Sequence, residues 1–530
     1  MTREMLYDAI TEIKDDLVVE AMETEPAKSR VRWLKFGSIA AAVTLAAGLG
    51  AGVFSGKLPW LPIGGSAGGS GHEDNGSTFM SYAGPVFPLT TVEGGGGLTA
   101  ERAITYDFEG WMDGNPDRPY YGLPVTDSYT LTNPTGEDKT VTLLYPFASS
   151  LYGLSSNLPA LTAGGMELDT EVLAGGYCGG AGNGFFYDSS GYGNNWTYPR
   201  SWVDYQTILS DGSYQASALG EWPDLSHIPV TVYEITNPWL AGGITGANPS
   251  IHAKFALDNS KTTVLSYGFN GGFSSDDEGV MTRRLSFSVP IPPVEPDSPP
   301  LYYERELNQI RRIIVFGQPL YSFELLGVHD GAPDSTGYLE WGVEIGASLR
   351  QYETDLEAAL RAVAEDQFQM ENWRETGSSA QTPEFELYFG IMKDCLLSHG
   401  LLSGDPAERF ALGWLDEMDC VSMDRVFYLK AQLTVPAGGS VAVEASFLKD
   451  ASFDYYCANT ENRDVYGYDL VTRLGSSLDF TQQTAAAVNT DGVEIIRQNF
   501  GFDWENGVDT VTLDPVVEHY YLEARPAGKK

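Results

Sequence analysis

The amino-acid sequence predicts a mainly β protein: a β-sandwich-like exterior with a helical insertion in its second domain (α+β), joined to one N-terminal transmembrane helix. The first observation is composition, because 59 Gly, 29 Pro, 24 Phe, 29 Tyr and 11 Trp suit short strands and tight turns better than a helical bundle. The second is that short alternating apolar segments recur along residues 98–530. The third is an uncharged apolar run at residues 36–54.

The N-terminal segment, residues 1–35, predicts an amphipathic helix over residues 2–25 that ends near Pro26. Its apolar residues recur every three or four positions: Leu6, Ile10, Ile13, Leu17 and Ala21. Because a lone helix of this length is marginal in water, we expect its apolar stripe to bind a partner: another copy of the chain, the membrane surface or a cytoplasmic protein. The alternative is an inert segment that only assists insertion.

Residues 36–54 predict a membrane-spanning helix, because about 28 Å of helix matches a hydrocarbon core about 30 Å thick. Lys28, Arg30, Arg32 and Lys35 precede the run, so the positive-inside rule places the N-terminus in the cytoplasm. The C-terminal bulk is then expected on the extracytoplasmic side of the membrane. The alternative is a cleaved signal peptide, but the run and the segment before it are longer than such peptides usually are.

Three glycines at four-residue spacing, Gly48, Gly52 and Gly56, lie in and just after this run. Such spacing lets two helix backbones approach closely, so these residues are a candidate dimer face within the membrane. Their smallness is also common in membrane helices that do not pair.

Composition divides the exterior into domains. A Gly/Ser/Pro-rich tether at 55–97 precedes a first β-sandwich-like domain at 98–289, and a Pro-rich spacer at 290–300 precedes a second β-rich domain at 301–530. A helical insertion is expected at about 346–420.

In the first domain, residues 125–132 and 140–145 predict a hairpin in which Tyr129 and Leu131 face Val141 and Leu143. Further strands are expected at 230–235, 263–269 and 284–289.

In the second domain, a strand pair is expected within 311–326. A helix follows whose apolar positions are Leu349, Tyr352, Leu356, Leu360 and Val363, with further helices near 385–397 and 407–418. The clearest alternation predicts a second hairpin around the turn at 436–439, with Phe427, Leu429, Ala431, Leu433 and Val435 on one strand face.

The formal charge of −40 argues against a nucleic-acid binder, which needs a basic surface to displace counterions. It also attracts cations, so Ca²⁺ is a candidate ion. Asp113, Asn115 and Asp117 offer oxygen ligands at alternate positions, as part of a calcium loop does, and Asp276, Asp277 and Glu278 are a second, looser candidate cation site. The alternative for both groups is a solvated acidic turn.

Residues 177–205 combine aromatic side chains with Gly, Asn and Ser. Exposed rings beside amides and carboxylates suit sugar rings, so this segment is a candidate glycan site. The residues named for it are Tyr192, Trp196, Tyr198, Trp202 and Asp204. The alternative is that these rings pack over a β core.

Motifs for catalysis are lacking. The histidines show no HExxH pattern, and 64 acidic residues outside the membrane offer no evident pair for glycoside hydrolysis. Cys178, Cys395, Cys420 and Cys457 form no CxxC motif; a bridge between Cys395 and Cys420 is one alternative to buried thiols.

The helix, basic segment and apolar run of the first 55 residues or so resemble those of anti-sigma-factor-like single-pass surface proteins of Gram-positive bacteria. The segments LTNPTGEDKTVTLLYPF and LTVPAGGSVAVEASF resemble uncharacterised bacterial β-sandwich surface domains. We therefore expect a membrane-anchored surface protein that binds or senses an extracellular ligand, a glycan or a protein. The alternatives are a cell-wall or glycan hydrolase and a structural spacer.

Overall fold

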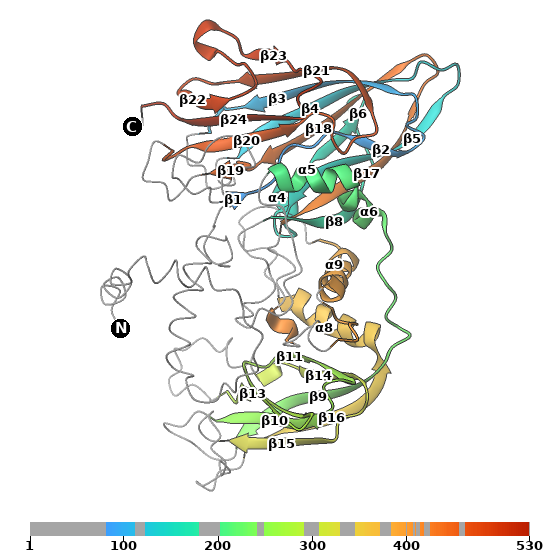
Figure 1. The fold of residues 1–530 in the computed structure, drawn as a ribbon, viewed down its shortest axis with the longest axis vertical. Helices are drawn as coiled ribbons and strands as arrows, with labels where there is room; N and C mark the ends of the chain where they lie inside the picture. The colour runs from blue at the N-terminus through green and yellow to red at the C-terminus, as the bar shows by residue number, and fades with distance from the viewer. Residues whose placement is uncertain are drawn as a thin grey trace, which may run out of the picture.

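The computed structural model describes residues 81–111, 122–179, 202–240, 249–290, 307–328, 345–370, 383–398, 400–405, 409, 414–417, 424–454 and 462–528. Over these residues the protein is mainly β, as predicted, with several sheets and a few helices (Figure 1). Strands within the sheets pair antiparallel except for the parallel pair of β3 and β21.

One part of the fold, here called the three-sheet body, contains a seven-stranded sheet (β23-β21-β3-β4-β18-β6-β7), a five-stranded sheet (β1-β19-β20-β24-β22) and the β5 sheet (β2-β5-β17-β8). Its elements are β1 (Ser81–Tyr82), β2 (Thr90–Glu93), β3 (Thr99–Asp107), β4 (Leu123–Thr132), β5 (Lys139–Ser149), α4 (Leu154–Asn157), β6 (Ala160–Ala163), β7 (Met166–Glu167), β8 (Glu171–Gly179), α5 (Trp202–Asp211), α6 (Ser213–Leu219), β17 (Asp424–Val435), β18 (Ser440–Lys449), β19 (Phe453–Asp454), β20 (Tyr466–Val471), β21 (Asp479–Val488), β22 (Val493–Gln498), the 3-10 turn η3 (Trp504–Asn506), β23 (Thr510–Thr512) and β24 (His519–Pro526).

The other part, the two-sheet body, contains the β14 sheet (β11-β14-β9-β16) and the β10 sheet (β12-β13-β10-β15). Its strands are β9 (Pro229–Leu240), β10 (Ser250–Leu257), β11 (Thr262–Tyr267), β12 (Gly271–Asp277), β13 (Val280–Ser288), β14 (Arg311–Gly317), β15 (Ser322–Val328) and β16 (Ile345–Asp355). Helices α8 (Leu356–Met370) and α9 (Phe385–Ser398) lie between the two bodies, and the short 3-10 turn η2 (Leu415–Glu417) follows them (Figure 1).

Strand pairing crosses the boundary expected at residues 290–300. β14 follows that segment but pairs with β9 before it, and β15 likewise pairs with β10. The two-sheet body lies in sequence between β8 and β17, which belong to the same β5 sheet. The described sheets therefore divide the chain by insertion of one body into the other, and not at the proline-rich segment, because proline content marks where a chain lacks ladder donors and does not mark which strands pair.

The two predicted hairpins are wrong in their pairing, although their strands are confirmed. β4 pairs with β3 and β18, whereas β5 pairs with β2 and β17, so the turn between β4 and β5 crosses from one sheet to another. β17 and β18 are separated in the same way. The strand pair expected within 311–326 also divides, with β14 and β15 in different sheets.

Although these turns lead from one sheet to another, the strands on both sides still bury the residues that the alternating pattern predicted to be buried. Tyr129, Leu131, Val141 and Leu143 belong to one buried cluster, and so do the five alternating residues of β17. An apolar strand face satisfies its burial equally well against a hairpin partner or across a core, so alternation cannot distinguish the two.

Asn133, which is fully buried, connects the β4–β5 turn to the β17–β18 turn through hydrogen bonds. Its Nδ2 donates to the Glu137 carbonyl at 2.8 Å and to the Val435 carbonyl at 3.1 Å. Its backbone N–H donates to the Gly439 carbonyl at 2.9 Å. The Asn133 side chain therefore joins the β4–β5 turn to the β17–β18 turn.

Helix α8 begins later than predicted. Leu349 and Tyr352 lie on β16, opposite Ile235 and Val232 of β9. The helix starts at Leu356 because the Asp355 carboxylate accepts a hydrogen bond from the Ala358 N–H at 2.8 Å, as an N-cap does. Leu356, Leu360 and Val363 are buried on it, as predicted.

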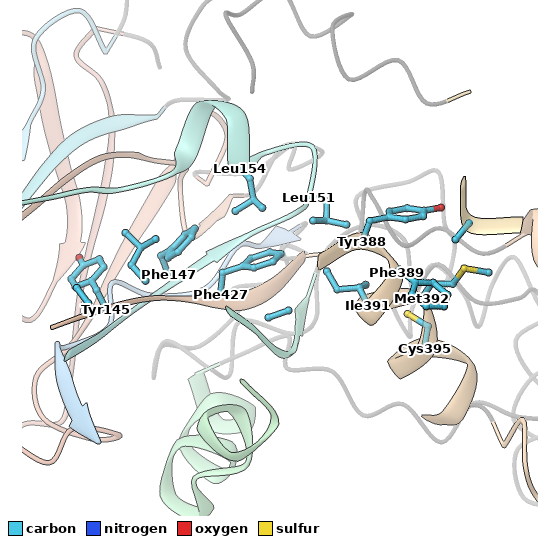
Figure 2. Close-up of a cluster of buried hydrophobic side chains, with 14 of the residues drawn as sticks. Tyr145, Phe147, Leu151, Leu154, Tyr388, Phe389, Ile391, Met392, Cys395 and Phe427 are labelled. Atoms are coloured by element: carbon cyan, nitrogen blue, oxygen red, sulfur yellow. The ribbon is translucent and has the colours of Figure 1, made fainter. Parts of the chain in front are cut away.

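A continuous apolar cluster connects the two bodies. It runs from Tyr145 and Phe147 on β5 through Phe427 on β17 to Ile391 and Met392 on α9, as Figure 2 shows. The same cluster includes Val230 and Val232, which lie on the β14 sheet against α8. Helices α8 and α9 therefore fill the space between the bodies with shared core.

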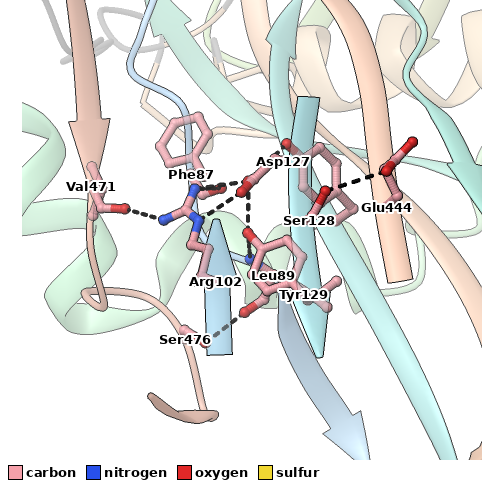
Figure 3. A network of polar contacts seen from close by, with 10 residues as sticks. Phe87, Leu89, Arg102, Asp127, Ser128, Tyr129, Glu444, Val471 and Ser476 are labelled. Atoms are coloured by element: carbon pink, nitrogen blue, oxygen red, sulfur yellow. Dashed lines mark hydrogen bonds and ion pairs between the residues drawn. The ribbon is translucent and has the colours of Figure 1, made fainter. Parts of the chain in front are cut away.

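An ion pair is buried in the three-sheet body. The Arg102 guanidinium donates to both carboxylate oxygens of Asp127 at 2.8 Å, and to the carbonyls of Val471 at 2.7 Å and Phe87 at 3.1 Å (Figure 3). The Tyr129 hydroxyl donates to the same carboxylate at 2.7 Å. The network thus joins β3 and β4 to β20 in the five-stranded sheet.

Candidate functional site

The predicted glycan residues are only partly within the described structure. Tyr192, Trp196 and Tyr198 and the side chain of Asp204 lie outside it. Trp202 begins α5 and is 9% exposed, and its ring stacks on that of His519 with centroids 4.4 Å apart. Trp202 therefore contributes to packing and is not an exposed platform for a sugar ring.

One of the two candidate cation sites lies within the described residues. Asp113, Asn115 and Asp117 lie outside the described residues. Asp276 and Asp277 end β12 at a tight hairpin turn, where Asp276 Oδ1 accepts from the Gly279 N–H at 3.0 Å and Glu278 has a φ of 52°. Among the residues that the structure describes, no group of three or more His, Cys, Asp or Glu side chains is placed to hold a metal ion.

The segments predicted at residues 1–35 and 36–54, with Gly48, Gly52 and Gly56, lie outside the described residues. Within the described part of the chain, no helix combines the length and hydropathy needed to cross a bilayer. Cys395 is buried on α9, whereas Cys420, Cys457 and the side chain of Cys178 lie outside the description, so the bridge between Cys395 and Cys420 stays a prediction.

A cavity of about 280 Å³ lies where β5, α4 and β18 end beside the chain that follows β1. Three separate stretches of sequence line it: residues 83–87, 146–157 and 447–450. Most of its wall is apolar. The wall residues with rings are Pro85, Phe87, Pro146, Phe147, Tyr152 and Phe447.

Secondary structure brings three of the polar lining residues together. Lys449 is the last residue of β18 and is 6% exposed, and its Nζ donates to the backbone carbonyl of Asp450 at 2.9 Å. Asn157 ends the short helix α4, whose backbone N–H at that residue donates to the Gly153 carbonyl at 2.7 Å. The strand end and the helix end thus present Lys449, Asp450 and Asn157 to one cavity.

Burial raises the pKa of the Asp450 carboxyl above its usual range, and the nearby Lys449 charge and a hydrogen bond with Asn157 offset part of that rise. Asp450 Oδ1 and Asn157 Oδ1 are both shielded from solvent and have no hydrogen-bond partner. A raised carboxyl pKa and convergent polar groups in an apolar cavity are typical of binding and active sites.

The sequence carried little signal for this site. Lys449 ends the alternating strand β18, and Asp450 follows it and precedes buried Ala451 and Ser452. Charged residues between apolar stretches are usually surface turns, so local pattern alone favours a solvated turn. Only the long-range packing of residues 83–87 and 146–157 encloses them.

No protein-family model, no curated protein and no solved structure matches this chain. The candidate site therefore rests on the geometry of its own residues.

Proposed function

We propose that the protein is a single-pass, membrane-anchored surface protein whose extracytoplasmic part binds an extracellular ligand, with the cavity beside Asp450 as the binding site. The apolar run at 36–54 and its basic N-terminal flank support the anchor and its orientation. The paired sheets that share buried cores support a β-sandwich-like exterior.

The observation that carries the binding proposal is the cavity with two unpaired buried oxygens. An unmet buried acceptor costs about 1–3 kcal/mol, so a purely structural spacer gains nothing by keeping two of them beside a cavity. A ligand in the cavity that supplies hydrogen-bond donors recovers that free energy once a side-chain rotation turns these oxygens toward it.

Binding is favoured over glycan hydrolysis. Hydrolysis by the usual route needs two carboxylates about 5–10 Å apart across the bond that breaks. Among the described residues that line the cavity, Asp450 is the one carboxylate, and the polar group beside it is an amide. Asp450 therefore suits recognition better than paired acid and base chemistry.

The test has two arms. In the first, protease is added to intact cells that express the chain with an epitope at each end; we expect loss of the C-terminal epitope and survival of the N-terminal one. In the second, the purified full chain is titrated with glycans, cell-wall fragments and peptides, with and without Ca²⁺. A hit weakened by Asp450→Asn supports the cavity, whereas a hit weakened only by Trp196→Ala assigns binding to the aromatic segment.

Protection of the C-terminal epitope in intact cells would refute the surface location. If no member of the panel binds in the second arm, the binding proposal is refuted and a role as a structural spacer is favoured. Because β1 and β2 belong to the three-sheet body, a fragment that begins at residue 98 removes strands of two sheets, so the full chain is the right material.

A further inference from the structure

The wall of the cavity beside Asp450 contains two hydrogen-bond acceptors that receive no hydrogen bond. Asp450 Oδ1 and Asn157 Oδ1 are acceptors without partners on neighbouring parts of one wall. The terminal torsion of Asp and Asn side chains is broad, so a modest rotation turns either oxygen toward a molecule in the cavity. A matching ligand therefore offers two donors a short distance apart.

The charges in the wall restrict the charge of that ligand. The Lys449 ammonium, itself buried, lies beside the Asp450 carboxyl and lowers the free energy of its ionised form. The opposite charges of Lys449 and Asp450 offset each other, so a charged ligand would lose its hydration in a mainly apolar cavity without a net opposite charge to replace it. A neutral ligand avoids that cost, and hydroxyl groups can donate to the oxygens and accept from a cation.

The remaining wall favours a ring with an apolar face. Phe87, Phe147 and Phe447 line the cavity together with Tyr152. Aromatic faces contact the C–H face of a saturated ring while its hydroxyls bond elsewhere. At about 280 Å³ the cavity lies just below the size of sites for drug-sized ligands, so it suits a single small ring.

We propose that this cavity binds one neutral pyranose ring through two neighbouring hydroxyls that donate to Asp450 and Asn157. This inference rests on the proposed function, because it names the ligand class of the same site. It places sugar recognition on residues 83–87, 146–157 and 447–450, away from the aromatic segment at 177–205 that the sequence suggested.

The test uses the full chain in a detergent without a sugar headgroup, so that the detergent cannot occupy the site. The probes are methyl α-glucopyranoside (neutral), glucosamine (cationic) and glucuronate (anionic), each titrated by ligand-observed saturation-transfer NMR and calorimetry. We expect saturable binding of the neutral ring and at least tenfold weaker binding of the two charged rings.

Two near-isosteric variants address the acceptors. Asp450→Asn replaces one charged acceptor oxygen by an NH2 donor, and Asn157→Leu removes the amide oxygen. Each should weaken binding of methyl α-glucopyranoside by about three- to tenfold, the worth of one net hydrogen bond. Asp491→Asn is the matched control, because Asp491 is exposed, and it should leave the affinity unchanged. A measurement that needs no variant is hydrogen exchange on the wild-type chain, which should slow across 146–157 when the probe is saturating.

Tighter binding of glucosamine or glucuronate than of the neutral ring would overturn this inference and leave the proposed binding function intact. The same holds if no probe slows exchange at 146–157 while Asp450→Asn abolishes binding of some other panel member. If no ligand of any class binds to the folded chain, both the inference and the proposed binding function are refuted.

Discussion

The buried Arg102–Asp127 pair offers the sharpest test of how the three-sheet body is held together. Arg102→Met keeps most of the side-chain volume but removes every hydrogen bond of the guanidinium. Four of these are to the Asp127 carboxylate and to the carbonyls of Val471 and Phe87. The carboxylate would remain fully buried without its cation.

The expected loss is large because the penalty is one of desolvation. Breaking a buried pair by removing one partner costs about 3–5 kcal/mol, and two carbonyls also lose a donor. The Tyr129 and Tyr145 hydroxyls still donate to Asp127, and burial raises the pKa of both tyrosines, so they remain neutral donors at physiological pH. We therefore expect Arg102→Met to lower the free energy of unfolding by about 4 kcal/mol.

Equilibrium urea unfolding and native-state hydrogen exchange together measure this loss. Exchange should accelerate in β3, β4 and β20 and stay unchanged in β9 and β14, which lie in the other body. The double variant Arg102→Met with Asp127→Leu should lose less than the two single variants added together, because no buried charge is left unpaired.

Arg350→Met is the matched control. Arg350 is 70% exposed, and its Nη1 lies 3.7 Å from Glu234, so its removal should change stability by less than about 1 kcal/mol. If Arg102→Met were as mild as Arg350→Met, or if the double variant were simply additive, the buried pair would not organise this body as we argue.

Burial, with a smaller contribution from Arg284, lowers the pKa of His252 to about 4, below the unfolded value near 6.5. The contribution of His252 to stability should therefore be full above pH 6.5 and fall by up to about 3 kcal/mol as the pH drops from 6.5 to 4. Unfolding measured against pH should lack this loss in His252→Gln. Asn133→Ala should cost about 1–3 kcal/mol in chemical unfolding, since the Val435 carbonyl loses its side-chain donor, and a change below 0.5 kcal/mol would contradict the joining role of Asn133. Gly467→Ala places a Cβ about 2.1 Å from the ring of buried Phe453, so its melting temperature should drop sharply while that of Gly96→Ala, in open space, should not.

Local patterns identified strands and one helix well. The alternation of β17, the strands near 230–235 and 263–269, and helix α9 all lie where the sequence placed them. These features depend on the two- and 3.6-residue periods of side chains along one segment, so neighbouring residues are sufficient to predict them.

Near Leu349 the spacing of apolar residues predicts a helix, but the chain forms strand β16. Leu349 and Tyr352 are three residues apart, so they share one side of a helix but lie on opposite faces of a strand, and Leu349 is exposed on β16. Pairing with β9, together with the cap at Asp355, decided for β16. The stretch was therefore assigned by its neighbour in space and not by its own period.

Sequence pattern alone was sufficient to locate the strongly alternating strands, the residues they bury and the long uncharged run at 36–54. The tertiary structure alone decided which strands pair, that one body is inserted into the other, and that Arg102 meets Asp127. It also decided that Asp450 and Asn157, nearly 300 residues apart, share one cavity. The physical reason is range: periodicity acts between neighbours, whereas strand partners, buried ion pairs and cavities depend on contacts whose separation along the chain leaves no local pattern.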